Sequence, residues 1–84
     1  MGAEPLIVNA QDELVEQLAH PSYEVVWNRA IAVFGGTELA RDWMNTPLPT
    51  LADQTPDFVA RSGDADRQRE VLRILISIDY GMFN

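Results

Sequence analysis

Apolar positions along this chain recur at helical spacing, and short segments between them carry residues that start or stop helices. The clearest case follows Ser22, a typical N-cap residue, and ends before Gly35-Gly36, which supply a left-handed stop. One apolar stripe runs along this segment, with a period of three to four residues, and it consists of Tyr23, Trp27, Ala30, Ile31 and Phe34. The pattern predicts a helix over Tyr23–Phe34.

Four further segments show the same combination of a capping residue, an apolar face and a Gly or Pro stop. The predicted helices cover residues 10–20, 38–44, 56–61 and 65 to 79 or 80, and their caps are Asn9, Thr37, Thr55 and Asp64. Pro56 takes the first helical position of the short fourth helix, where its missing N–H costs nothing. The chain therefore reads as five helices joined by short loops.

Nothing in the sequence predicts a sheet. Leu6-Ile7-Val8 is apolar but only three residues long, and Pro47 and Pro49 make the segment before Leu51 a rigid connector that cannot be helical throughout. We therefore expect an all-α fold in one small domain. Its first helix either packs on the others or lies at the periphery.

The last predicted helix carries more apolar surface than one buried face requires. Its six apolar residues cover an arc of about 200°, twice the stripe that a single core-facing side needs, and they are Val71, Leu72, Ile74, Leu75, Ile76 and Ile78. We assign Val71, Leu75 and Trp43 to the core. Part of the remaining arc is expected to contact another chain, which makes an interaction protein the first hypothesis.

Composition restricts the function further. The chain has 84 residues, no cysteine and a net charge of −7, with arginine as its only strongly basic residue. This balance opposes non-specific binding to DNA and docking to an anionic membrane. No apolar run is long enough to span a membrane and no basic leader precedes an apolar stretch. The default localisation is cytoplasmic.

Residues for catalysis or metal binding are missing. His20 is the only histidine, and its place at the end of the first helix favours a structural or surface role. The spacing of Asp57, Asp64 and Asp66 differs from that of a calcium-binding loop. We interpret these residues as part of helix N-termini. Gly35-Gly36-Thr37-Glu38 lacks the strand and lysine of a phosphate loop. We therefore expect no enzyme, no metal and no cofactor.

Other polar and aromatic residues favour plain structural roles. Trp27 and Trp43 stand at helical spacing and are predicted to be packing residues. Arg67, Arg69 and Arg73 alternate with acids, which is typical of a solvated helix face, although an arginine that reaches a partner's carboxylate stays open. Asp79 falls inside the apolar arc, so either the helix frays there or the carboxylate meets a donor.

From about Asn28 onward the order of residues resembles a known family. The shared positions are Ala30, Val33-Phe34-Gly35, Ala40, Trp43-Met44, Pro47, Leu51, Thr55-Pro56, Gly63, Val71, Leu75, Ile78 and Tyr80-Gly81. This ordered set is similar to the toxin-binding domain of the MbcA/ParS/Xre antitoxins. The resemblance implies a RES-domain toxin that consumes NAD⁺ as the partner, inhibited when the C-terminal region of the antitoxin covers the entrance of its active site.

Two departures from the family pattern stand out. The family has a glycine-rich step after the leucine of the connector, where this chain has Ala52-Asp53. This substitution puts the local turn in question. Many relatives also carry a helix-turn-helix domain in front, and we expect none here, because fewer than thirty residues precede the match.

The leading hypothesis is an antitoxin whose residues 1–22 form an N-terminal segment with one helix and whose residues 23–84 form the toxin-binding domain. The candidate toxin-binding residues are Ile74, Ile78, Tyr80, Gly81, Met82, Phe83 and Asn84. Met and aromatic anchors are favoured at interface centres, Gly81 lets the chain turn, and the Asn84 carboxylate could reach cationic groups. A DNA-binding transcriptional autoregulator and an orphan domain that forms a homodimer are the alternatives.

The sequence leaves several points open. These are the chemistry of the toxin (NAD⁺ degradation or ADP-ribosylation), the stoichiometry of the complex and the regulation of the chain's own operon. Residues 1–22 could pack on the domain, dimerise, or become ordered on binding.

Overall fold

The computed structural model describes residues 10–81, with side chains from residue 12 onward, so Asn9 and Leu6-Ile7-Val8 lie outside the described residues. Five α-helices and one 3₁₀ turn form: α1 (Ala10–Ala19), α2 (Tyr23–Phe34), α3 (Thr37–Met44), η1 (Pro49–Leu51), α4 (Pro56–Ala60) and α5 (Ala65–Asp79). Between residues 10 and 81 the only β-type pairing is an isolated bridge from Leu48 to Gln54. The all-α prediction is confirmed.

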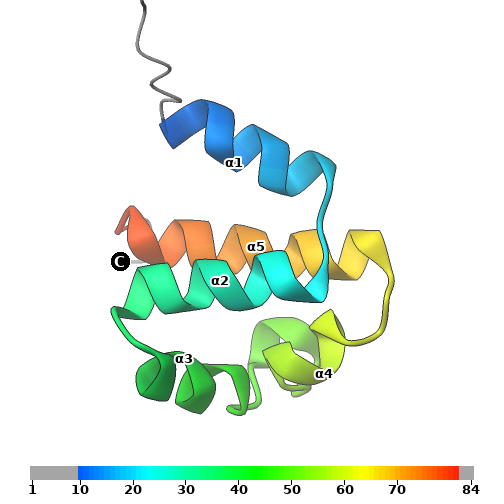
Figure 1. Ribbon diagram of the computed structural model, residues 1–84. Helices are drawn as coiled ribbons and strands as arrows, with labels where there is room; N and C mark the ends of the chain where they lie inside the picture. Colours follow the sequence, from blue (N-terminus) through cyan, green and yellow to red (C-terminus); the bar gives the residue numbers. More distant parts are fainter. Residues whose placement is uncertain (1–9, 82–84) are drawn as a thin grey trace, which may run out of the picture.

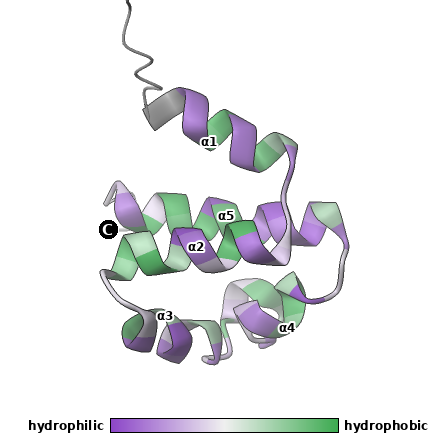
Figure 2. Cartoon of the chain, viewed as in Figure 1, coloured by the Kyte–Doolittle hydropathy of each residue, from purple (hydrophilic) through white to green (hydrophobic). Residues whose placement is uncertain are grey.

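The two long helices α2 and α5 lie side by side at the centre of the domain (Figure 1). Helices α3 and α4 cover one side of this pair: α3 contacts α2, and α4 contacts α5. Helix α1 lies on the opposite side and contacts α5. Both α2 and α5 carry apolar segments (Figure 2), and residues of both pack in the core. This arrangement gives α5 three helical neighbours.

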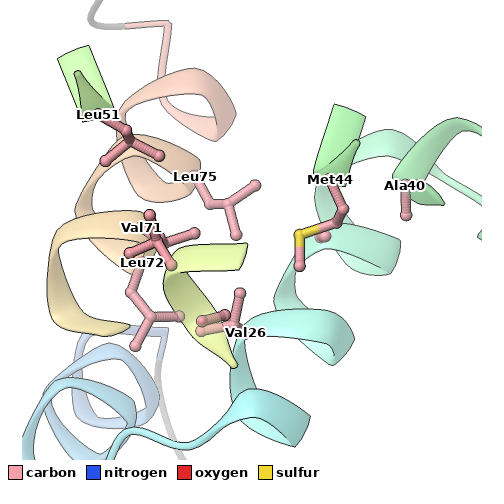
Figure 3. Close-up of a cluster of buried hydrophobic side chains, with 10 residues drawn as sticks. Val26, Ala40, Met44, Leu51, Val71, Leu72 and Leu75 are labelled. Atoms are coloured by element: carbon pink, nitrogen blue, oxygen red, sulfur yellow. The ribbon is translucent and has the colours of Figure 1, made fainter. Parts of the chain in front are cut away.

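The core is built from residues of α2, α3, η1, α4 and α5 (Figure 3). Its buried members are Val26, Ala30, Ala40, Met44, Leu51, Val59, Ala60, Val71, Leu72 and Leu75. Val71 and Leu75 are fully buried, as predicted, and Trp43 is half-buried against the cluster. Since every described helix except α1 contributes to this core, α1 is the peripheral element of the domain.

Three of the predicted caps are confirmed. The side chains of Ser22, Thr55 and Asp64 accept hydrogen bonds from the backbone N–H groups two or three residues ahead, at 3.1, 3.1 and 2.9 Å. Thr37 is wrong as a cap. Gly36 occupies the N-cap position without a side-chain bond, and α3 begins at Thr37 itself. Gly35, in the left-handed conformation, ends α2 in a tight turn. As a result α3 begins at Thr37, one residue earlier than predicted.

The apolar stripe predicted for α2 is displaced from its true buried face. Val26, which the stripe left out, is fully buried together with Ala30, whereas Tyr23, Trp27 and Ile31 are only half-buried. The reason is that α2 contacts α5 on one side and α3 on another. A helix that packs against two other helices buries the residues that lie between its two contact faces. A single apolar stripe does not predict which residues these are.

The connector closes through a compact turn that includes η1. The backbone N–H of Leu48 donates to Gln54 O at 3.1 Å, and that of Asp53 donates to Leu48 O at 2.9 Å. Ala52 and Asp53 both have positive φ, 57° and 66°. The turn thus adopts the left-handed backbone that glycine favours, although neither residue is glycine. The turn buries Leu51 in the core.

Candidate functional site: the end of α5 and a polar pocket between α2, α3 and α4

The predicted interface residues on α5 lie on its last turns. Ile74 and Ile78 are four residues apart and so share one helix face. Both are half-buried, and Ile74 also packs against the core. Tyr80 follows the helix with 52% of its surface exposed. The structure therefore brings Ile74, Ile78 and Tyr80 to one end of the domain, while Met82, Phe83 and Asn84 lie outside the described residues.

Backbone geometry stops α5 where the sequence predicts. The N–H of Tyr80 donates to Ile76 O at 3.0 Å and that of Gly81 to Ile78 O at 3.2 Å. Gly81 has φ 67°, in the left-handed region. No neighbouring atom would meet a side chain there, so the conformation rather than space favours glycine. The chain leaves the helix axis at this residue.

The wide apolar arc of α5 is covered more completely by its own domain than the sequence suggests. Val71, Leu72 and Leu75 are fully buried, because α2, α4 and α1 each contact α5. Ile76 and Ile78 stay half-exposed near the end of the helix. The apolar surface left for a partner is therefore restricted to the last two turns.

Asp79 and the two tryptophans have simple environments. Asp79 is exposed at the final residue of α5, so neither fraying of the helix nor a buried donor is needed to accommodate its carboxylate.

The ring of Trp43 lies 5.6 Å from that of Phe34, centroid to centroid, in a tilted arrangement. Trp27 packs against the core and also lines a pocket. Packing accounts fully for Trp43 and only in part for Trp27.

The sequence did not predict this pocket. It has a volume of about 290 Å³ and is lined by Tyr23, Trp27, Arg41, Met44, Asn45, Asp57 and Arg61. These residues come from α2, from α3 and α4, and from the residues that follow α3 and α4, Asn45 and Arg61. Tyr23 and Asp57 are 34 positions apart, and no local pattern links them. Only the packing of α4 near the start of α2 brings them together.

One wall of the pocket is a three-residue polar cluster. The hydroxyl of Tyr23 donates to Asp57 Oδ1 at 2.6 Å, and Nε of Arg61 donates to Asp57 Oδ2 at 2.7 Å. The Arg61 guanidinium also lies over the Tyr23 ring, 4.6 Å from its centroid. We call Tyr23, Asp57 and Arg61 the tyrosine cluster. Both Asp57 oxygens and the Tyr23 hydroxyl therefore have a hydrogen-bond partner within the cluster.

These contacts shift the pKa of each member. Partial burial and the bond to Asp57 raise the pKa of Tyr23. Burial alone would raise the pKa of Asp57, but hydrogen bonds from Tyr23 and Arg61 outweigh it and lower that pKa below its ordinary value. The bond to the Asp57 carboxylate raises the pKa of Arg61. At neutral pH the cluster is therefore held as neutral Tyr, carboxylate and guanidinium.

Within the described residues no group of three or more His, Cys, Asp or Glu could hold a metal ion. Asp64 and Asp66 serve the start of α5, where the Asp64 carboxylate caps the helix. From residue 10 to 81, no helix has both the length and the apolar character needed to cross a bilayer.

The fold and the end of α5 define a small all-helical binding module. Residues 29–81 match the antitoxin Xre/MbcA/ParS C-terminal toxin-binding domain, and the chain belongs to this family. The predicted resemblance is thereby confirmed over most of the length proposed for it. Neither a curated protein nor a solved structure matches the chain significantly.

Proposed function

We propose that this chain is the antitoxin of a type II toxin–antitoxin system and neutralises a RES-domain toxin that consumes NAD⁺ in the cytoplasm. The observation that carries the proposal is family membership across residues 29–81, a domain whose role is toxin binding. The resemblance described above adds the RES class of the partner and its use of NAD⁺.

Direct occlusion of the toxin's active site is the mechanism that we propose. Support comes from the end of α5, where Ile78 is half-buried and Tyr80 half-exposed just before the chain turns at Gly81. In the sequence two further anchors follow, Met82 and Phe83. Aromatic and Met residues concentrate binding energy at interface centres. Residues 80–84 would enter the toxin, and Ile74 and Ile78 would border the contact.

The test uses a purified RES-domain toxin, with NAD⁺ consumption as the readout. Tyr80→Ala should weaken inhibition about 30-fold, the effect of losing one interface hot spot. Removal of residues 80–84 should abolish inhibition. Phe58→Ala is the matched control, because Phe58 is also an exposed aromatic residue, at 62% against 52% for Tyr80, but lies on α4.

Circular dichroism and thermal unfolding establish that each variant folds. If the folded truncated chain inhibits as well as the intact chain, occlusion by residues 80–84 is wrong. If the intact chain neither binds nor inhibits the toxin, the RES partner itself is wrong. Equal losses in Tyr80→Ala and Phe58→Ala would place the contact elsewhere than at the end of α5.

A further inference from the structure

We propose that the pocket between α2, α3 and α4 binds an acidic side chain presented by a partner protein. None of its lining residues belongs to α5, so it is distinct from the toxin-binding end proposed above. Figure 1 shows α3 and α4 together on the side of α2 away from α1. The proposal does not depend on which toxin the chain opposes.

Charge is the first argument. Among the pocket's ionised groups, Arg61 is paired with Asp57 at 2.7 Å, whereas the side chain of Arg41 is exposed and has no partner among residues 12–81. The pocket therefore holds one uncompensated guanidinium in a chain whose net charge is −7. Arg–carboxylate contacts are among the strongest hydrogen-bonded pairs in proteins. An unpaired arginine in an acidic chain favours an anionic ligand from outside.

The hydrogen-bonding groups of the pocket point to the same ligand. The indole N–H of Trp27 makes no hydrogen bond to any described residue. Among the described residues, every buried side-chain N or O atom has a hydrogen-bond partner. The indole nitrogen is therefore not buried, and solvent reaches it. The Asn45 amide nitrogen uses one bond, at 2.9 Å, on the backbone oxygen of Arg41 and keeps a second N–H. The acceptor oxygens of Asp57 are already occupied. Residues that line the pocket thus carry N–H groups without a partner among the described residues, which favours a ligand that accepts hydrogen bonds.

The size of the pocket is sufficient for a single acidic side chain. The volume of about 290 Å³ lies just below the range of roughly 300–1,000 Å³ typical of small-molecule sites. Met44, whose side chain is buried, also lines the pocket, and Trp27 and Tyr23 supply apolar surface for the methylene groups of a Glu or Asp. Trp, Tyr and Arg are the residues most enriched in interface hot spots. Repulsion from the chain's distant acids is screened beyond about 8 Å at physiological ionic strength.

The experiment titrates the intact ¹⁵N-labelled chain with the peptide acetyl-Leu-Glu-Leu-amide and follows the indole N–H signals. Binding should shift the Trp27 signal with a dissociation constant on the order of 1 mM, as expected of one charged anchor. Arg41→Met should weaken binding about 10-fold or more, because a charge-assisted hydrogen bond is lost. Arg73→Met is the matched control, since Arg73 is also exposed, has no side-chain partner among the described residues and lies on α5.

Several results would overturn the proposal. Equal binding of acetyl-Leu-Gln-Leu-amide would show that the carboxylate is not recognised. Inorganic phosphate that shifts Trp27 as tightly as the peptide would identify a general anion site in place of a docking site for an acidic side chain. A response at Trp43 alone, or equal losses in both arginine variants, would place binding outside this pocket. No toxin enters the experiment, so its outcome is separate from that of the occlusion test.

Discussion

The guanidinium of Arg69 on α5 donates a 2.6 Å hydrogen bond from Nε to the backbone carbonyl of Leu18, near the end of α1. The last carbonyls of a helix have no partner within the helix, and a cation near them also meets the negative end of the helix dipole. Arg29 on α2 adds a second tie, from its Nε to Gln17 Oε1 at 3.0 Å. Two arginines thus hold the acidic α1 on the central helix pair.

Arg69→Met should loosen α1 without unfolding the core. The substitution keeps an aliphatic side chain of similar length but removes the bond to Leu18. We expect α1 amides to exchange with solvent about 5- to 30-fold faster, which corresponds to about 1–2 kcal/mol for one charge-assisted hydrogen bond that is partly exposed. Hydrogen exchange followed by NMR measures the effect residue by residue.

The control for this prediction is Arg73→Met. Arg73 lies one turn further along α5, is exposed and has no side-chain partner within the described part of the chain. Its variant should leave α1 exchange unchanged. Equal exchange in the Arg69 variant and the parent would show that the bond from Arg69 to Leu18 is not needed to hold α1.

The tyrosine cluster predicts a specific pH dependence of stability. The pKa of Asp57 is lowered in the folded chain, so its contribution is present above the ordinary value of 3.8 and is lost as pH falls through the folded pKa. The pKa of Tyr23 is raised, so its contribution is present below 10.0 and is lost as pH rises through the folded pKa. Stability should therefore fall at both extremes.

Tyr23→Phe should remove the alkaline part of this dependence. At pH 7 the free energy of unfolding should fall by about 1 kcal/mol, because a hydrogen bond to a partly exposed carboxylate is lost. Above pH 10 the variant and parent should converge. Urea unfolding followed by tryptophan fluorescence measures both, and Tyr80→Phe serves as the control because the Tyr80 hydroxyl has no partner among residues 12–81. A constant difference at every pH would contradict the linkage.

The strained turn at Ala52 predicts a stabilising substitution. An L-residue in the left-handed region costs roughly 1–2 kcal/mol, and Ala52 is exposed at φ 57°. Ala52→Gly relieves this strain but increases the entropy of the unfolded chain. We expect a net gain of about 0.5 kcal/mol, seen as a rise in Tm of about 2–4 °C by calorimetry.

The matched control for the turn is Ala32→Gly. Ala32 is exposed inside α2, where glycine costs about 1 kcal/mol relative to alanine. The two identical substitutions should therefore change stability in opposite directions. A loss at position 52 comparable to that at position 32 would show that the turn stores no strain.

Local chemistry explains which parts of this fold the sequence could predict. Helix boundaries depend on neighbours within a few residues, so Ser22, Thr55 and Asp64 were identified correctly as caps. Contacts between helices depend on crossing geometry, which periodicity does not contain. The periodicity therefore does not place Val26 in the core, and it does not predict the proximity of Tyr23 to Asp57.

One of the two candidate sites could be predicted from the sequence, and the other could not. The end of α5 could be proposed from sequence because its apolar excess and its glycine stop are adjacent in the chain. The pocket could not be proposed from sequence, since Trp27 lies on α2, Arg41 on α3 and Arg61 directly after α4. Arg69 shows an intermediate case. Its charge pattern predicted a solvated face, and it does pair with Asp66 at 2.7 Å, but its bond to Leu18 depends on where α1 packs.

Gln68 is the buried polar residue that joins α5 to α4. It is 6% exposed, and its Nε2 donates to the carbonyl of Ala60 at 2.9 Å, at the last residue of α4. Gln68→Glu keeps the shape of the side chain but replaces the donor with a carboxylate. At pH 7 we expect a loss of about 2 kcal/mol or more, because a buried charge then faces an acceptor oxygen.

This loss should shrink on acidification. Burial raises the pKa of the introduced carboxyl in the folded state, so its destabilising effect vanishes below the unfolded value of about 4.3 and grows as pH rises. Gln17→Glu is the control with the opposite expectation. The Gln17 oxygen accepts from Arg29, so a carboxylate there gains a charged partner and should change stability by only a few tenths of a kcal/mol, in the favourable direction. Urea unfolding at pH 5 and pH 7 compares the two. A pH-independent loss at position 68 would mean that solvent reaches the Ala60 carbonyl and that the core around α4 is open.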